Sequence, residues 1–516
     1  MLPTPPAIFR SLVAALILAV GLPLLGQQAQ PPELKEFQAA SAIQDPASKL
    51  KELERLKAAY PESRLKLAFD AQISAARIAL AGTLDEVLGL QKDALASTKG
   101  IQRLSYLLLF SPQILEHPKA ATFDKGKVLE AVQDYRDQAQ KVSSDPALVA
   151  GENGQLRELI PRMVRSLDLQ VAKAQLFAGQ PAKALVSLDA YAKADGSANA
   201  LYLLFRADVL EALDRPKEAY EALLGAALEG HKDGLRRAKA AYAKLNGKED
   251  GFEAMLEAKL KEPPFHPAPV RPGPAWKGKA VLAELFTGSE CPPCVAADFA
   301  FDGLMESRPE TALVVLEYHL PIPGPDPMMN PATRKRQDYY GVTSTPTMFF
   351  DGQDKLTGGG SRGAAEAKYA QVSAKVQERA DGVPGAALEV KATRAGDQVG
   401  AVLELGKALE GVDYHLALVQ GQQEHKGGNR IMVHKMVVRD MTTLDPGATK
   451  ASFDLAASEK ATDAYLTDFE RTSTRFKGFH FPVRRSAISR EGLKVVLFAQ
   501  ERATKKVLQA VVADVK

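Results

Sequence analysis

Two cysteines, Cys291 and Cys294, are the only thiols in a chain of 516 residues, and two prolines separate them. They stand in the run KAVLAELFTGSECPPCVAADFAFDGLME (279–306), in which an apolar strand pattern precedes the pair and a helical pattern follows it. A disulfide between them would close a very short loop and so would stabilise the fold little. A Cys-x-x-Cys between a strand and a helix is typical of a redox pair. The sequence therefore predicts redox chemistry at this junction.

Length and charge limit the alternatives. A chain of 516 residues should divide into several domains, because single hydrophobic cores stop growing at roughly 250–300 residues. The net charge of +3 is the small difference between 66 basic and 63 acidic side chains, which gives no electrostatic case for a nucleic-acid partner. The chain contains no phosphate-binding loop, Gly-x-Ser-x-Gly or His-Glu-x-x-His motif, so we expect neither a nucleotide cofactor nor hydrolase chemistry.

The first residues have the features of an export signal. Arg10 is followed by an apolar stretch over 11–20, and a polar stretch of small residues begins at about residue 26. An uncleaved membrane anchor is the alternative, but the apolar run 12–25 is interrupted by glycine and proline and is shorter than the ~20 residues that a spanning helix needs. We expect 1–26 to be a cleaved signal peptide and the mature chain to be periplasmic or secreted, without an integral membrane segment and in a compartment where disulfides persist.

Residues 33–262 are predicted to be helical throughout, because they are rich in Ala, Leu, Lys and Glu at helical spacing. The segment 176–185 realigns with 210–220, which places Pro181 and Pro216 35 residues apart. This period resembles that of tetratricopeptide repeats, nominally ~34 residues, and the resemblance implies stacked helix pairs that present a surface to a protein partner. A helical bundle with recurring turns is the alternative.

A proline-rich stretch at 263–275 follows, and it is predicted to be a semi-rigid extended linker at a domain boundary. From there to residue 382, strand and helix patterns alternate. Strands are predicted at 280–286, 311–319, 347–350 and 356–358, and helices at 294–307, 331–340 and 363–380. The order βαβαββα predicts an α/β domain over 276–382, with a parallel first half and an antiparallel hairpin.

The run ECPPC after a strand, with Thr345-Pro346 some fifty residues later, resembles the thioredoxin superfamily. The resemblance implies a thioredoxin-like fold in which a cis-proline, Pro346, opposes the cysteine pair and Thr345 contacts the backbone of the substrate. Cys291 is the expected nucleophile, because the N–H groups and the positive dipole end of the following helix favour its thiolate. Cys294 is the expected resolving thiol.

Two positions differ from the thioredoxin pattern. The family usually carries tryptophan before the first cysteine, where this chain has Glu290, and it buries an aspartate six positions before that cysteine, where this chain has Leu285. Glu284 is the candidate for proton transfer, although strand alternation would direct it to the other face of the sheet, and Glu290 is a weaker candidate.

Residues 383–516 are predicted to be mainly strands, with hairpins over 387–405 and 493–512, and the pattern suggests an immunoglobulin-like β-sandwich. The run GGNRIMVHKMVVRDM (427–441) resembles the C-terminal domain of outer-membrane-associated thioredoxin-like proteins. Together with RQDYYGVTSTPTMFFDG (336–352), this resemblance to a secreted bacterial branch of the superfamily covers roughly the second half of the chain.

These patterns predict an exported thiol–disulfide oxidoreductase that acts on protein thiols or disulfides. One alternative is a non-enzymatic envelope scaffold that keeps the fold as a spacer. Another is copper capture by the cysteine pair and His319, since thiolate and imidazole suit copper. His415, His425 and His434 lack compact ligand spacing and are expected to be surface or hydrogen-bonding residues. Whether the pair reduces, oxidises or isomerises disulfides depends on its reduction potential, so the sequence leaves the direction open.

Overall fold

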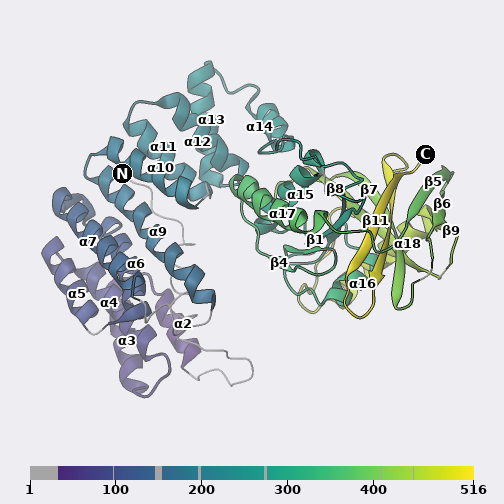
Figure 1. Cartoon of the computed structure of the whole chain (residues 1–516). Helices are drawn as coiled ribbons and strands as arrows, with labels where there is room; N and C mark the ends of the chain where they lie inside the picture. Colours follow the sequence, from purple (N-terminus) through teal and green to yellow (C-terminus); the bar gives the residue numbers. More distant parts are fainter. Residues whose placement is uncertain are drawn as a thin grey trace. The chain divides into compact units, whose positions relative to one another are not determined.

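The computed structural model describes residues 33–96, 98–145, 154–195, 199–271, 273, 276–407, 409–445 and 447–516 (Figure 1). The predicted signal peptide, 1–26, lies outside these residues. The chain divides into two units, one ending at Asp195 and joined by Asp208–Arg215, the other comprising Gly196–Ala207 and Pro216–Lys516. Helices occupy the first unit, and helices together with both β-sheets occupy the second. The expectation of a multidomain protein with separate α and α/β regions is confirmed.

The described part of the N-terminal half is helical, as predicted, and its helices begin where local sequence favours a start. Asp45 accepts a hydrogen bond from the backbone N–H of Ser48, and Asp124 one from that of Lys127, each at 2.8 Å, so both residues are N-caps. The helices are α2 (Leu34–Ala42), α3 (Pro46–Ala59), α4 (Lys66–Leu80), α5 (Leu84–Ala96), α6 (Gly100–Leu115), α7 (Lys125–Ser143), α9 (Gly154–Phe177), α10 (Pro181–Asp195), α11 (Ala200–Ala212), α12 (Pro216–Leu228), α13 (Lys232–Asn246) and α14 (Phe252–Lys261), with a short 3-10 turn at η1 (Ala120–Thr122).

The two turns that the repeat alignment superimposes have the same backbone conformation. Gly179 has φ 70° and Asp214 has φ 53°, both in the left-handed region, and each stands two residues before the proline that opens the next helix. In both turns the backbone N–H of the next residue, which stands directly before the proline, donates to the carbonyl five residues earlier. The distance is 2.8 Å in the first turn and 3.0 Å in the second. The aligned segments therefore end one helix and begin the next in the same way.

The second unit contains a mixed sheet whose strands come from both of the predicted C-terminal domains, 276–382 and 383–516. Within the described residues its strand order is β11-β10-β7-β8-β2-β1-β3-β4, and β5, β6 and β9 form a separate three-stranded sheet. The strands are β1 (Val281–Thr287), β2 (Leu313–His319), β3 (Thr347–Phe350), β4 (Leu356–Thr357), β5 (Glu389–Ala395), β6 (Gln398–Glu404), β7 (Val412–Glu424), β8 (Val433–Leu444), β9 (Lys450–Asp454), β10 (Leu493–Glu501) and β11 (Val507–Asp514). β1 pairs in parallel with β2 and antiparallel with β3.

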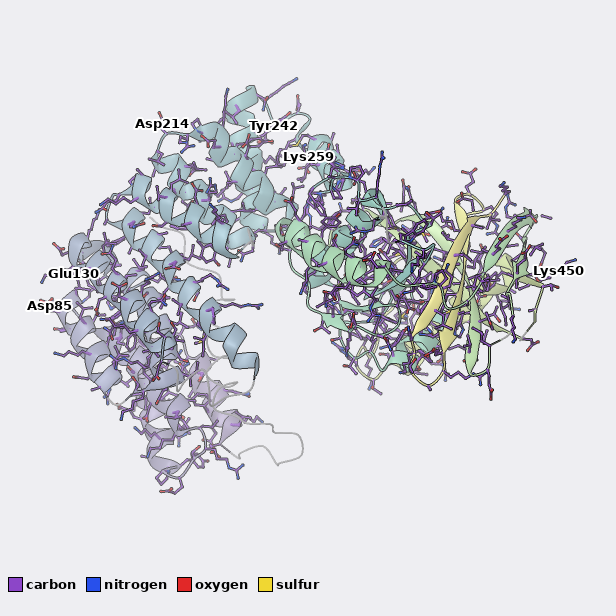
Figure 2. All side chains as sticks on the ribbon, viewed as in Figure 1. Asp85, Glu130, Asp214, Tyr242, Lys259 and Lys450 are labelled. Atoms are coloured by element: carbon purple, nitrogen blue, oxygen red, sulfur yellow. A yellow bond between two sulfur atoms is a disulfide. The ribbon has the colours of Figure 1, made fainter. Side chains whose placement is uncertain are left out.

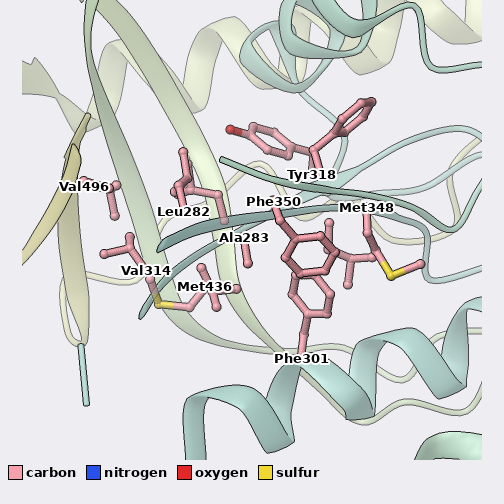
Figure 3. Close-up of a cluster of buried hydrophobic side chains, with 14 of the residues drawn as sticks. Leu282, Ala283, Phe301, Val314, Tyr318, Met348, Phe350, Met436 and Val496 are labelled. Carbon is pink, nitrogen blue, oxygen red and sulfur yellow. The ribbon is translucent and has the colours of Figure 1, made fainter. Parts of the chain in front are cut away.

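The junction between the two strand groups is the parallel pairing of β2 with β8, in which Glu317 lies opposite Val437. Side chains from both groups share one hydrophobic core. Figure 3 shows Val496 of β10 and Met436 of β8 in the same cluster as Val314 of β2. Strands that the sequence assigned to a C-terminal β region thus extend the sheet that carries the cysteine pair.

Helices also occur in the C-terminal part of the second unit. They are η2 (Pro292–Cys294), α15 (Val295–Ser307), α16 (Pro331–Tyr340), η3 (Arg362–Ala364), α17 (Ala365–Ala380) and α18 (Leu455–Thr472). Phe301 of α15 packs on one face of the sheet and Tyr318 lies on the other (Figure 3). The α18 helix lies in the region predicted to be mainly strands and was missed. No helix in the described part of the chain is long and apolar enough to cross a bilayer.

Candidate functional site

The cysteine pair lies at the strand-to-helix junction that the sequence predicts. β1 ends at Thr287, and η2 begins at Pro292 and continues directly into α15. Cys291 and Cys294 form a disulfide with a Cα–Cα distance of 5.3 Å. The two prolines lie in the first turn, where they remove no helical hydrogen bond. Both cysteines have 0% of their surface exposed, so the disulfide is covered on all sides.

The loop before β3 forms part of this cover. The peptide bond between Thr345 and Pro346 is cis. The hydroxyl of Thr345 donates to the carbonyl of Ile322 at 2.7 Å, and its oxygen lies 3.4 Å from Sγ of Cys291. Four of the predicted site residues, the two cysteines, Thr345 and Pro346, therefore meet in one place.

A glycine segment covers the prolines between the cysteines. The N–H of Gly360 donates to the carbonyl of Pro293 at 2.7 Å, and the N–H of Ala296 donates to the carbonyl of Gly360 at 3.1 Å. A Cβ on Gly359 would overlap the carbonyl oxygen of Pro293. No predicted site residue lies in this segment, although the three consecutive glycines of LTGGGSRG (356–363) are a usable signal for close backbone approach.

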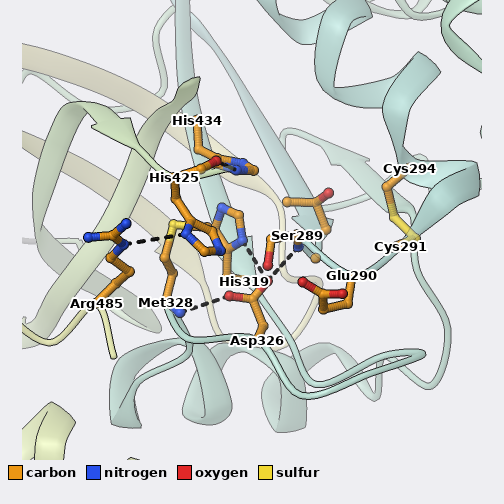
Figure 4. A network of polar contacts seen from close by, with 12 residues as sticks. Ser289, Glu290, Cys291, Cys294, His319, Asp326, Met328, His425, His434 and Arg485 are labelled. Atoms are coloured by element: carbon orange, nitrogen blue, oxygen red, sulfur yellow. Dashed lines mark hydrogen bonds and ion pairs between the residues drawn. A yellow bond between two sulfur atoms is a disulfide. The ribbon is translucent and has the colours of Figure 1, made fainter. Parts of the chain in front are cut away.

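The turn between β7 and β8 provides the third part of the cover. The N–H of Gly428 donates to Oε1 of Glu290 at 3.0 Å, and the N–H of Asn429 donates to the carbonyl of Ser289 at 2.9 Å. The side-chain amide of Asn429 donates to the carbonyl of Gly288 at 3.2 Å. Glu290, the weaker candidate for proton transfer, thus anchors a turn from the C-terminal strands beside Cys291 (Figure 4).

Because neither sulfur reaches the surface, a reagent reaches Cys291 only after part of this cover moves. We expect Asn429→Ala to increase the rate at which a water-soluble phosphine reduces the disulfide by several-fold. The variant loses two side-chain hydrogen bonds, the one to the carbonyl of Gly288 and the one accepted from the N–H of Ile431, each with a net value of about 1 kcal/mol. Lys426→Ala, an exposed substitution in the same turn, is the control and should leave the rate unchanged. An unchanged rate in the Asn429 variant would mean that another segment controls access.

Glu284 is not brought to the cysteine pair. Its carboxylate is fully buried and accepts two hydrogen bonds from the guanidinium of Arg336 of α16, at 2.7 and 2.9 Å. The hydroxyls of Tyr318 and Tyr340 also donate to it, at 2.9 and 2.6 Å. Glu284 lies on the same face of β1 as Phe286, whose ring stacks on that of Tyr318. This face is opposite the one on which α15 packs, so Glu284 holds a buried ion pair and does not face α15.

Other buried carboxyl groups, which no sequence motif indicated, lie between α15 and the sheet. Asp298 of α15 is 6% exposed, and both of its carboxylate oxygens lie 2.9 Å from the hydroxyl of Thr287. Glu317 of β2 is 2% exposed, and its Oε1 has no hydrogen-bond partner. Asp302, one turn further along α15, pairs with Lys435 of β8 at 3.1 Å. Aspartates four residues apart in the apolar helix VAADFAFDGL were the available signal.

The protonation of this cluster is set by burial. Burial raises the pKa of Asp298 well above its ordinary range, although the hydrogen bond from Thr287 favours the charged form. Burial and the nearby charge of Asp298 raise the pKa of Glu317 in the same direction. The pKa of Asp302 is raised to about 6, because the attraction of Lys435 offsets burial only in part. The cluster therefore retains protons at pH values at which exposed carboxyls have lost them.

His319 faces a different network, which Figure 4 shows beside the disulfide. Its Nδ1 lies 3.0 Å from Oδ2 of Asp326, and the backbone N–H of Ser289 donates to the same oxygen. Burial opposes ionisation of Asp326, but His319 and the backbone donors outweigh it and lower the pKa of Asp326 to about 2. The rings of His319 and His434 are 5.0 Å apart between centroids. Burial, with the charge of His319, lowers the pKa of His434 to about 3.

This network does not provide a metal centre. Over the described ranges, no three side chains of His, Cys, Asp or Glu are grouped so as to hold a metal ion. His425 accepts from Nε of Arg485 at 3.4 Å, and His415 lies on β7 against Thr443 at 3.1 Å. Burial lowers the pKa of His415 to about 4. The histidines form hydrogen bonds, and the Asp326 that His319 contacts also holds the loop that leads to Cys291.

Comparisons with known proteins add little. No protein-family model and no curated protein matches this chain. Among solved structures, an X-ray crystal structure of a structural-genomics target from Agrobacterium tumefaciens matches with 18% sequence identity. The match covers 45% of this chain and 92% of that one, with a TM-score of 0.27. At that score the likeness supports no conclusion about fold or function.

Proposed function

We propose that this protein is an exported thiol–disulfide oxidoreductase whose redox centre is the Cys291–Cys294 disulfide. The observation that carries the proposal is the placement of the only two cysteines in the sequence: they form one disulfide at the start of α15, beside Thr345 and a cis Pro346. The resemblance to thioredoxins, with its cis-proline loop opposite the cysteine pair, supports the same reading. The pattern of residues 1–26 supports export, and a compartment in which disulfides persist suits a chain with a single redox pair.

The chemistry at this site is thiol–disulfide exchange. A substrate thiolate attacks Sγ of Cys291, the bond between the two cysteines breaks, and Cys294 leaves as a thiolate that then takes up a proton. A second substrate thiolate attacks the mixed disulfide and releases Cys291, so the substrate is oxidised by two electrons and the cysteine pair is reduced. In the reverse direction Cys291 attacks a substrate disulfide and Cys294 resolves the mixed disulfide. The reduction potential of the pair decides which direction dominates.

Cys291 is the attacking sulfur in this scheme because of its place in the fold. It directly precedes η2 and α15, so the positive dipole end of the helix favours a thiolate there. Cys294 is the N-cap residue of α15 and is fully buried. Thr345 lies 3.4 Å from Sγ of Cys291, which supports the role that the resemblance implies for it, contact with the backbone of a substrate.

We further propose that the helical region 33–262 is a tetratricopeptide-like repeat that binds a protein partner, and that residues 383–516 contain an immunoglobulin-like element. The equivalent turns at Gly179 and Asp214 support the repeat. The separate sheet of β5, β6 and β9, packed beside the strands of the large sheet, supports the second proposal. On this scheme the flanking regions select the protein whose thiols reach Cys291.

The decisive test measures thiol–disulfide exchange between a disulfide-containing protein and variants in which one of the two cysteines is replaced. We expect Cys291→Ser to abolish exchange, because it removes the only sulfur that can form the first mixed disulfide. We expect Cys294→Ser to stop at that mixed disulfide and accumulate a covalent complex, visible on non-reducing gels and dissolved by a thiol reductant. Exchange that persists in the Cys291 variant would refute the proposal. Wild-type protein that exchanges no disulfide at all, yet still binds an envelope protein, would favour the scaffold alternative.

A further inference from the structure

The cluster of buried carboxyls between α15 and the sheet has a defined relation to Cys294. Asp298 follows Cys294 by four residues, and α15 continues from Cys294 without a break, so the two side chains lie on one face of the helix, one turn apart. Side chains on a helix are inclined toward its N-terminus, which directs the carboxylate of Asp298 back toward Cys294. The hydroxyl of Thr287, at the end of β1, donates to this carboxylate and fixes its position.

The charges around Asp298 come from four elements. Lys435 of β8 is 3.1 Å from Asp302 and so compensates that carboxyl first. Within the described residues neither Asp298 nor Glu317 of β2 forms an ion pair, although the charge of Lys435 favours ionisation of Glu317. Asp302 of the same helix and Asp326 of the proline-rich loop add negative potential at Asp298. Oε1 of Glu317 is buried and has no hydrogen-bond partner. The charge of one buried carboxylate opposes ionisation of the other, so Asp298 and Glu317 together retain a proton.

Asp298, one of this protonated pair of carboxyls, lies one helical turn from Cys294, the residue at which disulfide exchange requires a proton. When the disulfide opens, Cys294 leaves as a thiolate in a site with no exposed surface. A buried thiolate is costly unless a proton reaches it, and a buried thiol cannot attack until it loses its proton. Glu284 cannot serve, because Arg336 and two tyrosines hold its carboxylate on the opposite face of the sheet.

We propose that Asp298, coupled to Glu317, is the group that exchanges a proton with Cys294 during each turnover. This inference rests on the proposed thiol–disulfide exchange. When the substrate is oxidised, Asp298 gives its proton to the Cys294 thiolate as the S–S bond breaks, and the carboxylate is left ionised. When the substrate is reduced, the Asp298 carboxylate takes the proton from the Cys294 thiol, whose sulfur then forms the bond to Cys291 and expels the substrate thiolate. Burial raises the pKa of Asp298 above the ordinary range of a carboxyl, which makes it a better proton acceptor than an exposed carboxylate.

The two steps can be followed separately with Ellman's reagent on the fully reduced full-length protein. Cys291 attacks the reagent and releases one thionitrobenzoate, and Cys294 then displaces the second from the mixed disulfide. We expect the second phase in the wild type to accelerate as the pH rises through the raised pKa of Asp298 and then to level off, because Asp298 accepts a proton only when ionised.

In Asp298→Asn, which keeps the size of the side chain and an oxygen for Thr287, that rise should disappear. The second phase should be at least about tenfold slower than in the wild type at pH 7 and should approach it near the ordinary thiol pKa of about 8.5, where solvent deprotonates Cys294. Glu317→Gln removes the neighbouring carboxyl, lowers the pKa of Asp298 and should move the wild-type rise to lower pH. Glu306→Gln, which replaces an exposed carboxyl two turns further along the same helix, is the matched control and should leave the profile in place.

A purely structural role for Asp298 would slow the second phase equally at every pH, and this result would overturn the inference. If Asp298→Asn does not fold, the Glu317→Gln profile decides, since an unmoved rise also overturns it. The first phase reports Cys291 alone and should be unchanged in all three variants. Failure of the proposed function has a different signature: wild-type protein would show both phases with Ellman's reagent but no exchange with any protein disulfide.

Discussion

Replacing Arg336 with methionine is expected to destabilise the second unit by about 3–5 kcal/mol, because it leaves the carboxylate of Glu284 buried without its cation. Both side chains are almost completely buried, with exposures of 3% and 0%. Arg336 also lies over the ring of Tyr340 at 4.6 Å and donates to Gln500 of β10 at 2.8 Å, so its loss affects both parts of the large sheet. Denaturant unfolding followed by circular dichroism measures the change.

The control lies on the same helix. Arg334 pairs with Asp338 at 2.9 Å, but both are about half exposed, so Arg334→Met should cost less than about 1 kcal/mol. Replacing Glu284 and Arg336 together with methionine should recover much of the lost stability, because no uncompensated charge remains buried. If the Arg336 variant were as stable as the Arg334 variant, the assignment of Glu284 to a structural ion pair would be wrong.

Gly359→Ala is the second large effect that we expect. The added Cβ would overlap the backbone oxygen of Pro293 and would lie 2.8 Å from Cγ of Pro346, so neither neighbour can move by a simple side-chain rotation. The hydrogen bond from Gly360 to Pro293 must then lengthen or break. Overpacking of this kind costs typically 1–3 kcal/mol, and here it also separates the glycine segment from the cysteine loop. We expect a lower midpoint of denaturant unfolding together with faster phosphine reduction of the disulfide.

Gly400→Ala separates this clash from the general effect of replacing glycine. Gly400 lies in β6 of the same unit, and an added Cβ there meets nothing within 4 Å. That variant should change both the unfolding midpoint and the rate of reduction by much less. If Gly359→Ala behaved like Gly400→Ala, the close packing of the glycine segment on Pro293 would be contradicted.

The local elements of the second unit could be predicted because each has a clear sequence signature. Apolar runs bounded by turns indicate β1, β2 and β3, and Pro331 marks the start of α16, where Asn330 and Thr333 form a capping box. The α18 helix was missed because strands flank it on both sides, although Asp454 caps it by accepting from the N–H of Ala457 at 2.9 Å.

Long-range pairing was beyond the reach of the sequence. Nothing local to Glu317 or Val437 indicates that β2 and β8 are neighbours, since both are apolar strands with several possible partners. The cysteine pair, Thr345 and Pro346 could be placed together because a spacing known from thioredoxins links them. The roles of Glu290 and Asp298 depend on which segments fold against α15 and its preceding loop. Charge alone could not distinguish a proton donor, an anchor for a turn and a structural ion pair.

The pairing of β2 with β8 limits where the chain can be truncated or recombined without exposing an edge of the sheet. A fragment that stops near residue 382 would leave β2 as an open edge, with a row of unpaired N–H and C=O groups beside apolar side chains. Such an edge invites strand addition by other chains, so the fragment would self-associate, and it would also lose the turn that covers Cys291. The cysteine pair and the strands that cover it therefore belong to one sheet and one hydrophobic core, which recombination or truncation between them would disrupt.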